Sequence, residues 1–117
     1  MIRRAFFLLA CMTRPAAAHG QHFTQDEIAW LNRQVAVDGM KCCDETDAHV
    51  GTRVSWRIEG SRYQVRIQGA WHDVPPGRVM RSQPDDPSPW GGEALLFYSP
   101  RTGGGISLWC FRPEALH

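Results

Sequence analysis

Two runs of alternating residues on either side of Gly60-Ser61 constrain the fold of this chain most. Apolar residues occupy even positions in the first run, 50–58, and odd positions in the second run, 62–68. A period of two is the pattern of a half-buried strand, and a two-residue loop joins two such strands into a hairpin. We therefore expect a hairpin with Glu59 beside Arg62 on its outer face. Three pairs should lie on its buried face: Ile58 with Tyr63, Trp56 with Val65, and Val54 with Ile67.

The regions before and after this hairpin predict one helix and further strands. Thr24 and Glu27 form a capping box, which predicts a helix from about Gln25 to Val37. Three later strands are expected over 71–74, 94–99 and 106–111, and residues 82–92, rich in proline, read as a long loop. The predicted fold class is α+β: one N-terminal helix followed by a small five-stranded antiparallel sheet or a partly closed barrel, stabilised by a disulfide.

The first eighteen residues have the layout of a secretory signal peptide. Arg3 and Arg4 are followed by an apolar run, 5–10, and then by small residues at 16–18. We expect residues 1–18 to be removed and residues 19–117 to form a single domain that is periplasmic or secreted. An alternative is lipidation of Cys11, which follows Leu8-Leu9-Ala10. The apolar run is shorter than the roughly 20 residues of a membrane span, so no transmembrane segment is predicted.

The charge of the expected mature chain argues against nucleic-acid binding. The full chain has 13 Lys and Arg, of which three lie in 1–18, and 12 Asp and Glu, none of which do. Ten positive and twelve negative side chains give residues 19–117 a formal charge of −2. A dedicated nucleic-acid binder normally has a clear basic excess.

The cysteines of the expected mature chain predict a disulfide. An exported protein meets an oxidising compartment, in which thiols are normally paired. A bridge from Cys43, or from its neighbour Cys42, to Cys110 would tie the segment after the helix to the last strand. The remaining cysteine would stay buried, link two chains or be reactive.

Three short motifs resemble a group of small exported proteobacterial proteins of unknown function. They are Cys-Cys-Asp-Glu-Thr-Asp at 42–47, the segment 69–79 with its Pro-Pro-Gly-Arg-Val, and Trp-Cys-Phe-Arg-Pro at 109–113. The resemblance implies a secreted domain with cysteines and no particular activity. Members of the group have two further cysteines. This chain has Ala48 at the position of the first, and the second would lie near Phe97. Their joint absence implies that those two pair with each other, which leaves Cys42 or Cys43 for Cys110.

A metal site is an alternative reading of the same region. The side chains of Cys42, Cys43, Asp47 and His49 are all of types that bind zinc. Adjacent residues do not easily point at one ion, however, so a solvated acidic turn is the simpler interpretation. A mature chain that begins at His19 would also offer its terminal amine and imidazole as ligands for copper. The alternative interpretation is that these first residues form a frayed tail.

Surface side chains carry the remaining functional hypothesis. Under the predicted register, one outer face of the hairpin holds four arginines and a single acid, Glu59; the arginines are Arg53, Arg57, Arg62 and Arg66. Such a face would bind an anionic envelope polymer or an acidic protein; alternatively, it is a solvated face that protects the strands from edge pairing. Trp71 would belong to this face if its side chain points outward. The sequence leaves this open, because a bulge near Gly69 would exchange the faces of Trp71 and His72. Trp90 in the loop is the best candidate for an exposed aromatic residue.

No arrangement of residues predicts catalysis. The serines lie in no nucleophile motif, His72 and Asp73 are neighbours in a strand and so face opposite ways, and Gly103-Gly104-Gly105 precedes a strand rather than a helix. We therefore expect an exported, non-enzymatic binding or structural module without a cofactor, with a zinc- or copper-binding protein as the alternative.

Overall fold

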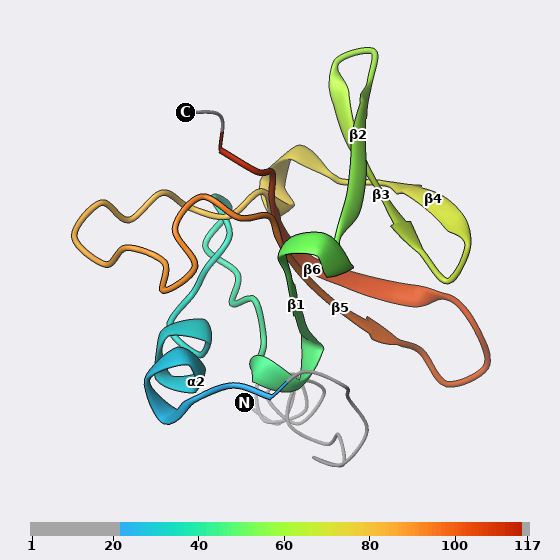
Figure 1. Ribbon diagram of the computed structural model, residues 1–117. Coiled ribbons are helices and arrows are strands. Elements are labelled where there is room, and N and C mark those ends of the chain that lie inside the picture. Colours follow the sequence, from blue (N-terminus) through green and yellow to red (C-terminus); the bar gives the residue numbers. More distant parts are fainter. Residues whose placement is uncertain (1–21, 116–117) are drawn as a thin grey trace, which may run out of the picture.

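The computed structural model describes residues 22–115, which form one short helix and six strands (Figure 1). The helix α2 spans Gln25–Leu31. One antiparallel sheet has the order β1-β5-β6, and its strands are Ala48–Val50, Leu95–Pro100 and Ile106–Arg112. The other has the order β2-β3-β4, and its strands are Ser55–Glu59, Arg62–Ile67 and Ala70–Asp73. None of the described helices is long and apolar enough to cross a membrane.

The α+β class and the antiparallel pairing are confirmed, but the single five-stranded sheet or partly closed barrel is wrong. The two sheets are separate because the expected strand 50–58 is interrupted by a 3-10 turn at Gly51–Arg53. Gly51 has φ +66°, a conformation that favours glycine, and its N–H donates to the carbonyl of Ala94. The chain therefore leaves the first sheet after Val50 and enters the second at Ser55.

The register of the β2-β3 hairpin agrees with the alternation pattern. Ile58 lies opposite Tyr63, Trp56 opposite Val65, and Glu59 opposite Arg62. Val54 precedes β2, so its predicted pairing with Ile67 does not occur. Ile58 is also not buried, because the hairpin extends away from the rest of the fold toward its turn and leaves this side chain 62% exposed (Figure 1).

Helix α2 begins as predicted and ends earlier. Thr24 Oγ accepts from the N–H of Glu27, and the Glu27 carboxylate accepts from the N–H of Thr24, so the capping box is confirmed. The helix was expected to continue to Val37 but ends at Leu31. The next residues instead form isolated antiparallel bridges, Val35 with Lys41 and Ala36 with Met80, because the chain here packs against other segments.

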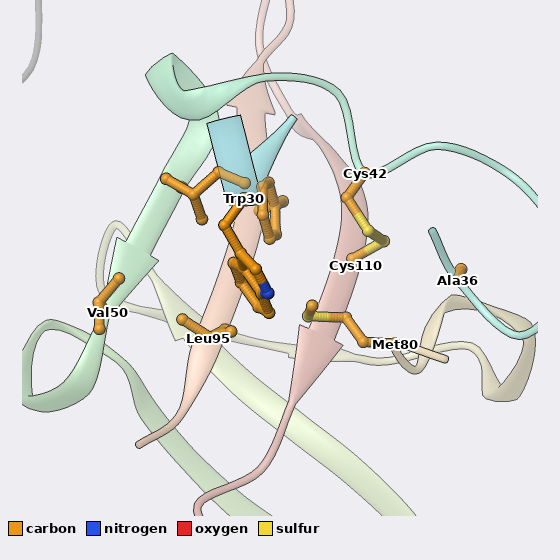
Figure 2. Packing of buried hydrophobic residues seen from close by; sticks show 10 residues of the cluster. Trp30, Ala36, Cys42, Val50, Met80, Leu95 and Cys110 are labelled. Atoms are coloured by element: carbon orange, nitrogen blue, oxygen red, sulfur yellow. A yellow bond between two sulfur atoms is a disulfide. The ribbon is translucent and has the colours of Figure 1, made fainter. Parts of the chain in front are cut away.

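Strand β5 divides the core into two clusters, because successive side chains of a strand point to opposite faces. Leu95 and Phe97 belong to the first cluster, together with residues of α2 and of the segment after it (Figure 2). Leu96 belongs to the second cluster, which includes Val65 and Ile67 of β3 and packs the sheet β2-β3-β4 onto the other face of β5 and β6. The sheet β1-β5-β6 is therefore the middle layer.

A disulfide bond joins the segment after α2 to the last strand (Figure 2), and it uses Cys42 rather than Cys43. The Cα atoms of Cys42 and Cys110 are 5.2 Å apart, and both residues are fully buried. The backbone of Cys42 is held by a hydrogen bond to the carbonyl of Gln34, whereas Cys43 has φ +72° and the chain turns there. Cys43 is itself disulfide-bonded, so no described cysteine carries a free thiol.

Candidate binding face

The outer face of β2-β3-β4 is an exposed grid of polar side chains around one tryptophan. Cross-strand neighbours share a face of a sheet, and the register sets the eight residues of this outer face in three rows. The rows are Glu59 with Arg62; Arg57 with Gln64 and Asp73; and Ser55 with Arg66 and Trp71.

Trp71 thus points outward, which the sequence left open. The turn between β3 and β4 consists of Gln68 and Gly69, both with positive φ, and pairs Ile67 with Ala70 without a bulge. Trp71 therefore lies opposite Arg66 on the outer face, and His72 lies opposite Val65 on the inner face.

A continuous set of contacts fixes two of the arginines. Arg57 Nε donates to Gln64 Oε1 at 2.8 Å, and Gln64 Nε2 donates to Asp73 Oδ1 at 2.7 Å. Arg62 forms an ion pair with the second oxygen of Asp73 at 2.9 Å. The guanidinium of Arg57 also lies over the ring of Trp71, 4.1 Å from its centroid, as a cation–π contact.

Arg66 differs from these neighbours. It is exposed and makes no ion pair or side-chain hydrogen bond with any residue of the described chain. Its guanidinium therefore keeps all five donors for water or a ligand. Arg66 lies between Ser55 and Trp71 in the register, so a group bound there would have a hydroxyl and an indole ring as neighbours.

One expectation for this face was wrong. Arg53 lies in the 3-10 turn before β2 and not on the strand, because the break at Gly51 removes it from the alternation. The third strand β4, which was not part of the predicted hairpin, adds a second acid, Asp73, so the whole face has three arginines and two carboxylates. A two-residue turn at Gln68-Gly69 fixes which residues of β4 point to the outer face. Recognising that turn in the sequence would have placed Asp73 on the outer face.

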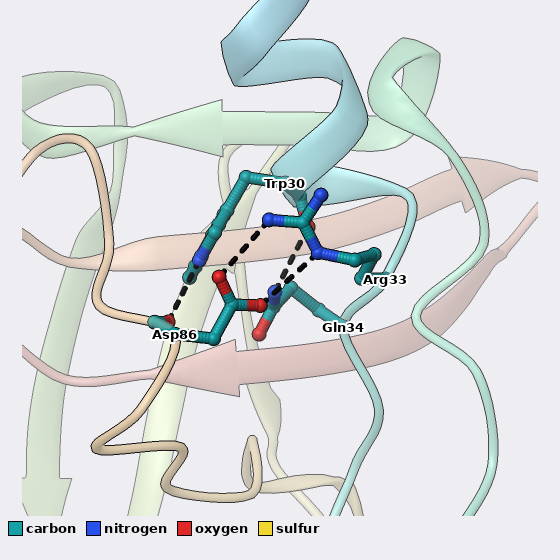
Figure 3. Close-up of polar contacts among 4 residues, drawn as sticks. All are labelled: Trp30, Arg33, Gln34 and Asp86. Atoms are coloured by element: carbon teal, nitrogen blue, oxygen red, sulfur yellow. Dashed lines mark hydrogen bonds and ion pairs between the residues drawn. The ribbon is translucent and has the colours of Figure 1, made fainter.

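Trp90 is partly buried and packs against other aromatic rings. Its ring makes edge contacts with Phe23, at 5.6 Å between centroids, and with Trp30, at 6.0 Å. The loop that holds it is anchored to α2, because Trp30 Nε1 donates to the carbonyl of Asp86 and Arg33 binds the Asp86 carboxylate through two nitrogens (Figure 3). The hydrogen bond from Arg33 lowers the pKa of Asp86.

A shallow cleft lies between this loop and α2, and we assign it a structural role. Its lining includes Trp30, Gln34 and Arg112. Gln34 donates to the carbonyl of Trp30, and one terminal nitrogen of Arg112 donates to the carbonyls of Gly91 and Glu93. Arg112 therefore ties the end of β6 to the loop, and Gln34 bonds back to the helix that it follows.

The four residues of the alternative metal site do not form a metal centre. Cys42 and Cys43 are both disulfide-bonded, so neither has a thiolate for zinc. The ring of His49 stacks on Tyr98, with 4.6 Å between centroids, and Asp47 is buried. Within residues 22–115, no group of three or more His, Cys, Asp or Glu is arranged to hold a metal ion. His19 lies outside the described residues.

Comparisons of the chain with protein-family models, curated proteins and solved structures found no match.

Proposed function

We propose that the chain is an exported, non-enzymatic binding module whose outer face on β2-β3-β4 binds an anionic polymer of the cell envelope. The observation that carries the proposal is Arg66, an exposed guanidinium without a described partner on a rigid sheet, next to an outward tryptophan. Arginine suits this role because its planar, permanently charged group binds carboxylates and phosphates through paired hydrogen bonds.

The spacing of the arginines favours an extended ligand. Arg62, Gln64 and Arg66 follow one another on the outer side of β3, and same-face residues of a strand are about 7 Å apart. Arg62 and Arg66 are therefore about 13 Å apart along the strand. A polymer with repeated negative charges can reach both, whereas a small anion reaches one.

Binding of alginate, a polymer of uronic acids, to the purified protein tests this face by titration calorimetry. Because hydrogen bonds to charged groups contribute about 1.5 kcal/mol or more, Arg66→Ala should weaken binding about tenfold. Arg101→Ala is the matched control, since Arg101 is an exposed arginine in the turn between β5 and β6 of the other sheet. Its affinity should equal that of the unmodified protein.

Two further measurements complete the test. Binding should weaken as salt is raised, because exposed charges are screened, and neutral dextran should not bind. Equal binding of dextran and alginate, or an affinity that neither Arg66→Ala nor salt changes, would contradict the proposal.

Export is tested separately. The intact mass of protein recovered from the periplasm of a Gram-negative host should correspond to a chain that begins at His19. Recovery of the whole protein in the cytoplasm with residues 1–18 attached would contradict export and leave the binding test unaffected.

A further inference from the structure

Strand β2 has an open edge. It pairs with β3 alone, and the two-residue turn that closes the hairpin makes Glu59 and Arg62 a hydrogen-bonded pair. The pattern alternates along the ladder, so the N–H and C=O groups of Trp56 and Ile58 point away from β3. No described residue forms a backbone hydrogen bond with them.

An exposed apolar side chain lies on the same edge. Ile58 is 62% exposed, the highest value among the large hydrophobic residues of the described chain. It lies on the inner face of the hairpin, whose tip extends away from the rest of the fold (Figure 1). An open edge with an exposed apolar residue is the arrangement to which another strand adds.

The charges beside Ile58 identify the strand that fits. Arg57 precedes it and Glu59 follows it, so the segment is complementary to itself when two copies run antiparallel and are centred on Ile58. Position 57 of each copy then lies opposite position 59 of the other on the outer face, and the outward amides of the two Ile58 residues pair. Arg57 Nε already lies 4.0 Å from Glu59 Oε2 of its own copy and donates to Gln64, so the pairing would extend this charge network across the edge. A shift centred on Arg57 would instead oppose two arginines, which is destabilising.

We infer that β2 forms a homodimer by pairing antiparallel with β2 of a second copy, in the register centred on Ile58. The two-fold axis is perpendicular to the sheet, so the dimer has one continuous six-stranded sheet. Both outer faces lie on the same side of it, and the two Ile58 side chains meet on the other side. The inference does not depend on the proposed function, because it concerns the edge of the sheet and needs no ligand.

Light scattering after size exclusion, over a series of protein concentrations and without ligand, tests the dimer. The purified protein should be dimeric. Glu59→Arg should raise the dissociation constant about tenfold or more, because two attractive pairs become repulsive. Glu114→Arg is the control: Glu114 is exposed and lies outside the sheets, and the same change in charge there should leave the dimer intact.

The double variant Arg57→Glu with Glu59→Arg tests the register. It exchanges the two charges, so the dimer lost in Glu59→Arg should return. Circular dichroism of each variant shows whether the fold is kept. A protein that is monomeric at every concentration, or a dimer that Glu59→Arg leaves unchanged, would overturn the inference, whatever the outcome of the alginate titration.

Discussion

Replacing both Cys42 and Cys110 with alanine should destabilise the domain by about 4 kcal/mol. The bridge joins residues 68 positions apart, and the chain-entropy relation gives about 4 kcal/mol for closing a loop of this length in the unfolded state. Stability of a small domain is about 5–15 kcal/mol in total, so the loss is a large share of it. The ratio of folded to unfolded protein should fall roughly a thousandfold.

Equilibrium unfolding in urea, followed by tryptophan fluorescence, measures this loss. Trp30 packs in the same cluster as the bridge and reports on its packing. At the urea dependence usual for small proteins, the midpoint should fall by about 2 M, and the slope should rise because the unfolded chain becomes less compact. Val37→Ala, at an exposed apolar position near Cys42, is the control and should change stability by less than about 0.5 kcal/mol. A loss below about 1 kcal/mol in the double variant would show that the bridge does not restrict the unfolded chain as the entropy relation requires.

Three smaller perturbations test other parts of the fold. Thr24→Ala should cost about 1 kcal/mol in thermal unfolding, because it removes the cap of α2; Thr24→Ser should keep most of that stability. Gly51→Ala should cost about 1–2 kcal/mol, since φ is +66° and the new Cβ would collide with the Glu93 carboxylate. Asp86→Asn should lower the melting temperature at pH 7. Arg33 holds the pKa of Asp86 down in the folded protein. The stability that comes from the ionised Asp86 side chain is therefore present above the usual aspartate pKa of about 3.9, and it is lost as the pH falls through the pKa of Asp86 in the folded protein. The difference between the two melting temperatures should therefore shrink as the pH falls below the usual aspartate pKa.

Features set by neighbouring residues could be predicted from the sequence. The start of α2 depends on Thr24 and Glu27, three residues apart, and the hairpin register depends on alternation and on a two-residue turn. Both were correct because the interactions that decide them are local.

Features set by distant segments could not be predicted. Val35 continues the apolar periodicity of a helix, but the chain there pairs with Lys41 and Met80 instead. The split into two sheets depends on the hydrogen bond from Gly51 to Ala94, which no local pattern reveals. Trp90 was expected to be exposed because its loop is rich in proline, yet that loop folds back onto α2.

The contacts of Arg57 connect the outer face of the sheet with its edge strand β2. Arg57 donates to Gln64 of β3 and lies over Trp71 of β4, and its Nε is also 4.0 Å from Glu59 Oε2 on its own strand β2. The face is thereby organised around Trp71, and the amides of Trp56 and Ile58 stay open to a second strand. The proposed binding face and the proposed pairing edge are therefore compatible on one sheet.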